Sequence, residues 1–132
     1  MKRHPVSYLR DILENRRDAQ EFVSGFSPQQ FAGDKKTVNA VLRSIEVIGE
    51  AAKHVPEDVR ARYPGIPWRE MAGMRDKLIH DYAGVDPSIV WLTITDRVPA
   101  LRPLLEKAVR ELEDISSSAG DTPGAANGTM FR

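Results

Sequence analysis

Apolar residues recur three or four positions apart through most of this sequence, and no segment alternates apolar and polar residues as a strand would. The pattern is clearest between Asp34 and His54, where one face would carry Val38, Val41, Leu42, Ile45 and Ile48. This spacing is that of an α-helix that buries one side. Asp34 suits the N-cap of this helix, because its carboxylate can accept a hydrogen bond from a free N–H group of the first turn.

Three further helices are expected, over residues 5–24, over residues 67–84 and from Asp86–Pro87 onward. Pro99 and Pro103 lie within the last of these and should kink or split it, because each lacks a backbone N–H. The connections between the helices are short. The expected fold is therefore all-α, an antiparallel four-helix bundle with a kinked last helix.

The composition is that of a globular protein, with 41% hydrophobic and 29% charged residues in a chain of 132. We expect one helical domain over residues 1–115. Residues 116–132 are mostly small and polar, which predicts a disordered C-terminal tail. Residues 56–67 contain three prolines and a glycine, which favours a loop with a short turn.

The charges balance, since 19 lysines and arginines face 19 aspartates and glutamates. A chain without net charge has no overall field to attract nucleic acid, so RNA binding would need a local patch or a groove between subunits. The absence of cysteine excludes disulfides, thiolate metal sites and a cysteine nucleophile. No segment has the pattern of a signal peptide or a membrane span, and the expected location is the cytoplasm.

The segment RDKLIHDY, from Arg75 to Tyr82, holds the main candidates for chemistry. A guanidinium suits phosphate oxygens, and an imidazole can take and give a proton near neutral pH. On an ideal helix Arg75 and His80 lie about 140° apart. A shared site therefore needs the arginine side chain to wrap round, a helix that ends near His80, or a second copy of the chain. We favour two copies that meet across a two-fold axis and pair their Arg75 and His80 residues in one cleft.

Spacing alone does not establish such a site. When an arginine and a histidine lie five positions apart, the arginine more often lies on the helix surface. The histidine more often makes a hydrogen bond in the core or at a helix end. The neighbouring sequence adds specificity, since it reads VNAVLRSIEVIGEAAK, then YPGIPW, MRDKLIHDY and VDPSIVW. These blocks closely resemble the HepT-like family of HEPN-domain proteins. The core motif of that family, Arg–four residues–His–any residue–Tyr, is matched by Arg75, His80 and Tyr82.

The resemblance implies a metal-independent ribonuclease that acts as a homodimer without a cofactor, and endonucleolytic cleavage is favoured. His80 would act as base toward the RNA 2′-hydroxyl or as acid toward the leaving oxygen. Arg75 would hold the scissile phosphate. Asp76 would either orient one of these two residues or be an ordinary exposed carboxylate. Proteins of this family are usually toxins of toxin–antitoxin pairs, and the implied partner is an MNT-type nucleotidyltransferase antitoxin.

Tyr82 has three interpretations: a core aromatic residue, a platform that stacks an RNA base, or a regulatory target. In similar families the partner nucleotidyltransferase attaches AMP to the motif tyrosine and silences the toxin. A bulky anion beside Arg75 would block the cleft and compete for the positive charge. We expect AMPylation of Tyr82 to be the silencing step, with structural packing as the main alternative.

Two carboxylates, Glu46 and Glu50, lie four positions apart and share one helix face. Such a pair can bind metal or serve as acid and base, but more often forms a salt-bridged surface. We favour a structural or dimer role for Glu50, packed near Gly49. His54 lies at a helix end and should interact with the C-terminal helix dipole.

Three basic residues in and around the resembling blocks are candidates for RNA binding: Lys53, Arg69 and Lys77. They would either form the basic rim of a cleft that binds the RNA backbone or be unrelated solvated charges on the surface. Two functional alternatives remain open. In the first, the chain is a non-catalytic helical module that docks on a nucleotidyltransferase. In the second, it is a helical dimer whose catalytic site has lost its activity.

Overall fold

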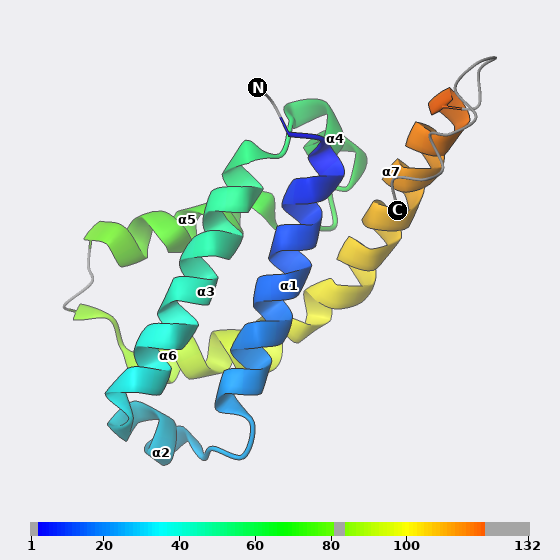
Figure 1. Ribbon diagram of the computed structural model, residues 1–132. Helices are drawn as coiled ribbons and strands as arrows, with labels where there is room; N and C mark the ends of the chain where they lie inside the picture. The colour runs from blue at the N-terminus through cyan, green and yellow to red at the C-terminus, as the bar shows by residue number, and fades with distance from the viewer. Residues whose placement is uncertain (1–2, 81–83, 121–132) are drawn as a thin grey trace.

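The computed structural model describes residues 3–80 and 84–120, without the side chains of residues 78–80 and 116–120. Every regular element within these residues is helical, which confirms the all-α class. Helices α1 (Pro5–Val23) and α3 (Lys35–His54) lie side by side and run in opposite directions (Figure 1). Helix α5 (Trp68–His80) crosses α3, and helix α7 (Arg102–Gly120) packs against α1.

Three short helices connect these long ones: α2 (Pro28–Gly33), α4 (Glu57–Arg62) and α6 (Pro87–Leu92). Helix α4 corrects the expectation of a loop over residues 56–67. Pro56 is the N-cap of α4, where the missing N–H is harmless, so it precedes the helix and does not disrupt it. None of the described helices combines the length and the apolar character needed to cross a membrane.

Helix α3 has the bounds that the sequence predicts. Asp34 is its N-cap, and Asp34 Oδ1 accepts a hydrogen bond from the backbone N–H of Thr37 at 3.2 Å. The helix ends at His54. This start and end define which residues of α3 face α1 and α5.

We expect Asp34→Ala to lower the free energy of unfolding by about 1 kcal/mol, because the Thr37 N–H loses its acceptor. Lys36→Ala is the matched control in the same turn, at an exposed position, and should change stability by less than about 0.5 kcal/mol. Urea unfolding followed by circular dichroism measures both. Equal losses in the two variants would show that the cap does not stabilise α3.

The last predicted helix is interrupted where Pro99 lies. A π-helical turn, η2 (Thr93–Arg97), follows α6, and its Val98 N–H donates to Thr93 O at 2.8 Å. Pro99 has no N–H to continue an α-helix, and its ring would meet the carbonyl of Thr95 in one. The predicted kink is therefore confirmed.

After this turn the chain makes a short 3₁₀ segment, η3 (Pro99–Leu101), and then enters α7. Pro103 is the second residue of α7, a position at which a backbone N–H is not needed. Helix α7 continues through residues 116–120 of the predicted tail. The remainder of that tail, residues 121–132, lies outside the described residues.

Apolar side chains pack in two clusters, one toward each end of the α1–α3 pair. Leu9 and Leu105 are fully buried in the cluster that joins α1, α3 and α7. Trp68 belongs to the same cluster, and its Nε1 donates to the carbonyl of Tyr63 at 3.0 Å. Trp91 packs at the edge of the other cluster, with its ring 5.5 Å from that of Phe31. Trp68 therefore anchors one cluster, and the partly buried Trp91 covers the edge of the other.

Candidate functional site

The close crossing of α3 and α5 depends on a glycine. Gly49 is buried in α3 and faces Arg75 of α5. A Cβ atom at position 49 would lie 2.2 Å from Arg75 Cβ and 2.8 Å from the carbonyl oxygen of Met71, which is too close for either contact. Only a residue without a side chain allows this approach. The crossing places the stem of Arg75 against the part of α3 that carries Glu50.

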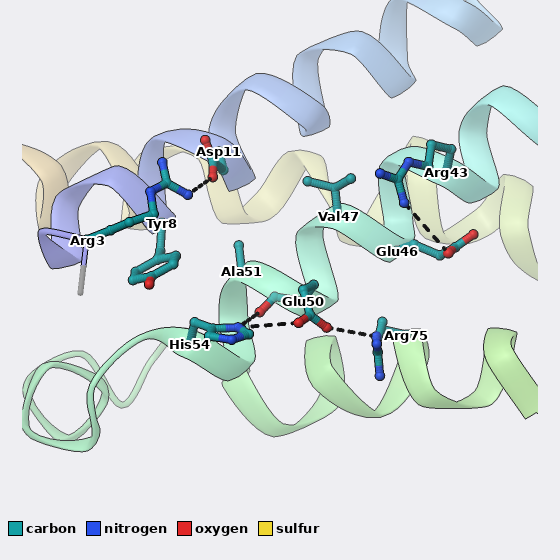
Figure 2. A pocket seen from close by; sticks show the side chains of 10 residues that line it. All are labelled: Arg3, Tyr8, Asp11, Arg43, Glu46, Val47, Glu50, Ala51, His54 and Arg75. Carbon is teal, nitrogen blue, oxygen red and sulfur yellow. Dashed lines mark hydrogen bonds and ion pairs between the residues drawn. The ribbon is translucent and has the colours of Figure 1, made fainter. Parts of the chain in front are cut away.

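An open groove of about 560 Å³ extends along α3 between Arg75 and the start of α1 (Figure 2). It brings together residues from three segments that are distant in the sequence. Its lining consists of Arg3, Tyr8, Asp11, Arg43, Glu46, Val47, Glu50, Ala51, His54 and Arg75. Arg75 is the residue of the predicted motif that lines this groove.

Two carboxylates hold the Arg75 guanidinium, which is 27% exposed as a side chain. Arg75 Nε is 3.0 Å from Glu50 Oε1, and Arg75 Nη1 donates to Asp76 Oδ1 at 3.1 Å. The contact with Glu50 is an ion pair and not a well-directed hydrogen bond. Glu50 Oε1 is sealed from solvent, and no described donor meets it with hydrogen-bond geometry.

Asp76 has a second donor on the neighbouring helix. Lys53 Nζ of α3 lies 3.3 Å from Asp76 Oδ1, the same oxygen that accepts from Arg75. The hydrogen bonds from Arg75 and then from Lys53 lower the pKa of Asp76. The carboxylate therefore stays ionised, and stays paired with Arg75, at a lower pH than an ordinary aspartate would.

His54 closes the other side of this cluster. Its Nδ1 is 2.8 Å from the carbonyl oxygen of Glu50 and 3.5 Å from Glu50 Oε2, and its ring stacks on Tyr8 at 5.7 Å (Figure 2). The contact with a carbonyl of the last turn is the helix-end role expected from the sequence. A carbonyl oxygen can only accept, so Nδ1 is the donor in this contact.

The charges of the groove balance. Its three guanidiniums belong to Arg3, Arg43 and Arg75, and its three carboxylates to Asp11, Glu46 and Glu50. A polyanion bound here would depend on individual, directed donors and not on a general positive field. Within the part of the chain that the structure describes, no three His, Asp or Glu side chains converge as they would to ligate a metal ion.

The predicted motif lies partly outside the described residues. Arg75 and Asp76 lie next to each other and are in contact. His80 is the last residue of α5, and its side chain is outside the described set. Tyr82 is outside that set entirely.

The residues that the sequence suggested more weakly for RNA binding lie in different places. Lys53 is paired with Asp76 beside the motif. Arg69 lines a shallow hollow between α4 and the start of α5, together with Arg60. Lys77 lines another hollow, between α5 and α6.

Glu50 has a contact that the sequence did not reveal. The sequence suggested a structural or dimer role for it, and the structure adds an ion pair between its carboxylate and Arg75 on another helix. Glu46, one turn earlier, is 3.9 Å from Arg43 of its own helix. Gly49 could have indicated this contact from the sequence, because a glycine inside an otherwise strong helix favours a close approach of another backbone. Glu50, the next residue, then lies at that contact.

Residues 12–108 match the protein family described as Ribonuclease HepT-like. The matched range includes all of α3 and α5, and with them Glu50, Arg75 and Asp76. Most of the helical part of the chain is therefore covered.

Several curated proteins are similar along nearly their whole length. A Thermococcus cleftensis protein named as a probable ribonuclease HepT is 48% identical over 107 residues, which cover 81% of this chain and 97% of the relative. A Methanocaldococcus jannaschii protein named as a putative RNase is 43% identical over 112 residues, covering 85% and 93% of the two chains. A Caldanaerobacter subterraneus protein with the same description is 44% identical over 108 residues, covering 82% and 93%. No solved structure gives a significant match. The chain belongs to the HepT-like ribonuclease family, which confirms the resemblance seen in its sequence blocks.

Proposed function

We propose that this protein is a metal-independent endoribonuclease that acts as a homodimer. The RNA 2′-hydroxyl attacks the adjacent phosphorus, and the bond from phosphorus to the 5′-oxygen breaks. The products are a 2′,3′-cyclic phosphate and a 5′-hydroxyl. Arg75 binds the phosphate, while His80 takes the proton from the 2′-hydroxyl or gives one to the leaving 5′-oxygen.

The observation that carries this proposal is the setting of Arg75 in a chain of a ribonuclease family. Its guanidinium lies at an open groove and is held by Glu50 and Asp76. A held guanidinium can bind two phosphate oxygens at once. It also offsets the negative charge that builds up during attack, an effect worth about 10²–10³-fold in rate when a single donor is removed.

A second copy of the chain completes the site in this proposal. Arg75 and His80 point about 140° apart on an ideal helix, so one helix does not present both side chains to one phosphate. Two copies related by a two-fold axis bring the arginine of one protomer to the histidine of its partner. Each of the two Arg75–His80 pairs then forms one site, in which the imidazole serves as base or as acid.

We further propose that the protein is the toxin of a toxin–antitoxin pair in the cytoplasm. An MNT-type nucleotidyltransferase antitoxin would attach AMP to Tyr82, two residues beyond His80. The added phosphate would pair with Arg75 and compete with the RNA phosphate for it. Modified protein should therefore lose RNA binding and cleavage together.

Cleavage in the absence of metal tests the central proposal. The purified protein is expected to cut single-stranded RNA in excess EDTA at a rate similar to that in Mg²⁺, because the proposed step takes its nucleophile from the RNA and its proton transfer and charge stabilisation from His80 and Arg75. Mass spectrometry should find 2′,3′-cyclic phosphate ends. A fully 2′-O-methylated RNA of the same sequence has no nucleophile and should stay intact.

His80→Ala, purified in parallel, reports any contaminating nuclease. Cleavage that disappears in EDTA and returns with Mg²⁺ would contradict metal independence. Intact RNA under both conditions would favour the alternative function, a helical module that docks on a nucleotidyltransferase without cutting RNA.

A further inference from the structure

Glu50 lies next to the point where α3 and α5 are in contact. It follows Gly49, whose missing side chain lets the stem of Arg75 lie against α3. The Glu50 side chain is 47% exposed, yet its Oε1 atom is turned inward to 3.0 Å from Arg75 Nε. The helix crossing therefore determines which carboxylate meets this arginine.

The ion pair between Glu50 Oε1 and the Arg75 guanidinium stabilises the positions of both groups. Glu50 Oε1 is sealed from solvent, and no described donor meets it with hydrogen-bond geometry. A carboxylate oxygen that loses water is destabilised unless a cation lies close to it. Arg75 Nε provides that cation, so the conformer with Nε beside Oε1 is preferred over conformers that leave the oxygen uncompensated.

His54 restrains the outer oxygen of the same carboxylate. Its Nδ1 lies 3.5 Å from Glu50 Oε2, and the ring is itself held by the Glu50 carbonyl and by stacking on Tyr8. Each carboxylate oxygen thus has a neighbour that is itself held by further contacts. Glu50 has less rotational freedom than a solvated surface glutamate, and it can act as a stable support.

Among the described residues, the contacts of Arg75 leave part of its guanidinium unoccupied. A guanidinium carries five N–H groups. Glu50 occupies the Nε side, and Asp76 accepts one N–H from Nη1. The remaining three N–H groups are on Nη1 and Nη2, and a neighbouring pair of Nη donors suits two oxygens of one phosphate.

Building on the ribonuclease function proposed above, we propose that Glu50 is a positioning residue, which holds Arg75 so that its free Nη donors face the RNA phosphate. Without this support the arginine side chain would rotate about its single bonds and present its donors in many directions. A displacement of about 1 Å at a reacting group can lower the rate by about 10²-fold. Glu50 acts through Arg75 and touches neither the phosphate nor the reacting atoms.

Glu50→Gln tests this role, because it keeps the size of the side chain and removes its charge. We expect kcat/KM for RNA cleavage to fall by about 10–100-fold. Affinity for a fully 2′-O-methylated RNA should fall by roughly tenfold. Glu46→Gln is the matched control, one turn earlier on α3 and in the same groove, and should change neither value by more than about twofold.

A double-mutant cycle separates positioning from a merely structural role. In an Arg75→Ala background, Glu50→Gln should not weaken binding of the methylated RNA any further, because no guanidinium remains to be held. An equal loss in both backgrounds would overturn the proposal. So would a Glu50→Gln variant that binds and cleaves RNA as well as Glu46→Gln does.

The two readouts distinguish this proposal from the ribonuclease function. If the wild type binds the methylated RNA through Arg75 and Glu50 but cleaves no RNA, the positioning role holds and the nuclease function is wrong. If the wild type cleaves RNA and Arg75→Ala does not, while Glu50→Gln cleaves normally, the nuclease function holds and the positioning role is wrong.

Discussion

Gly49→Ala is expected to lower the free energy of unfolding by about 1–3 kcal/mol, the usual range for forcing extra atoms into a packed contact. The new Cβ atom would meet Arg75 Cβ at 2.2 Å and the Met71 carbonyl oxygen at 2.8 Å. The second contact is with backbone, so rotation of a side chain cannot relieve it and α5 must move away from α3. The gain of up to about 1 kcal/mol from alanine in a helix does not offset this. The movement also takes Arg75 away from Glu50, so RNA cleavage should fall by more than about tenfold.

Gly73→Ala makes the same change on the other helix of the crossing and is the matched control. Apart from its chain neighbours and the nearby backbone of its own helix, no atom of the described residues lies within 4 Å of a Cβ added at Gly73. That variant should be more stable than the wild type by about 0.5–1 kcal/mol and should cleave RNA normally. Urea unfolding and an RNA cleavage assay measure both variants. A Gly49→Ala protein as stable as Gly73→Ala would show that the helices do not need this close approach.

Arg75→Ala and His80→Ala are each expected to lower RNA cleavage by about 10²–10⁴-fold, because one removes the phosphate contact and the other the proton-transfer group. The two inactive variants should also complement each other. In a mixture that is unfolded and refolded together, roughly half of the dimers contain one copy of each variant. In such a dimer the intact arginine of one protomer meets the intact histidine of its partner at one of the two sites. Activity should therefore return to about a quarter of the wild-type value.

The refolded mixture is compared with each variant refolded alone, at the same total protein concentration. Recovery seen only in the mixture requires sites built from both protomers. If the mixture stays as inactive as its components while wild-type protein regains activity under the same treatment, the shared cleft is wrong. Size-exclusion chromatography with light scattering, on the same samples, reports whether dimers are present at all.

The local parts of the fold could be predicted from the sequence because local chemistry determines them. Apolar spacing and the Asp34 cap predict where α3 begins and about where it ends, and Pro99 marks the break before α7. Helix α4 was missed because the prolines around residues 57–62 suggest a loop. Those prolines flank the six-residue helix without entering it.

The contacts of the candidate site could be predicted only in part. The sequence identifies Arg75 from its motif, but the partner of Arg75 depends on how α3 and α5 cross. A crossing is a tertiary property, set by which residues of two helices touch, and no periodicity within one helix contains it. Gly49 indicated a close contact somewhere on α3. The pairing of Glu50 with Arg75 could be identified only from the three-dimensional structure.

The π-helical turn explains how Val90, Ile94 and Val98 can all face the interior. These residues are four positions apart, and at about 100° per residue a regular α-helix would swing Val98 some 80° away from Val90. A wider turn holds more residues per revolution and cancels this angular error. Pro99, at the exit of the turn, has no N–H to continue an α-helical series of hydrogen bonds through this point. The π-helical turn thus keeps apolar residues that are spaced four apart on the buried side of the helix until α7 begins.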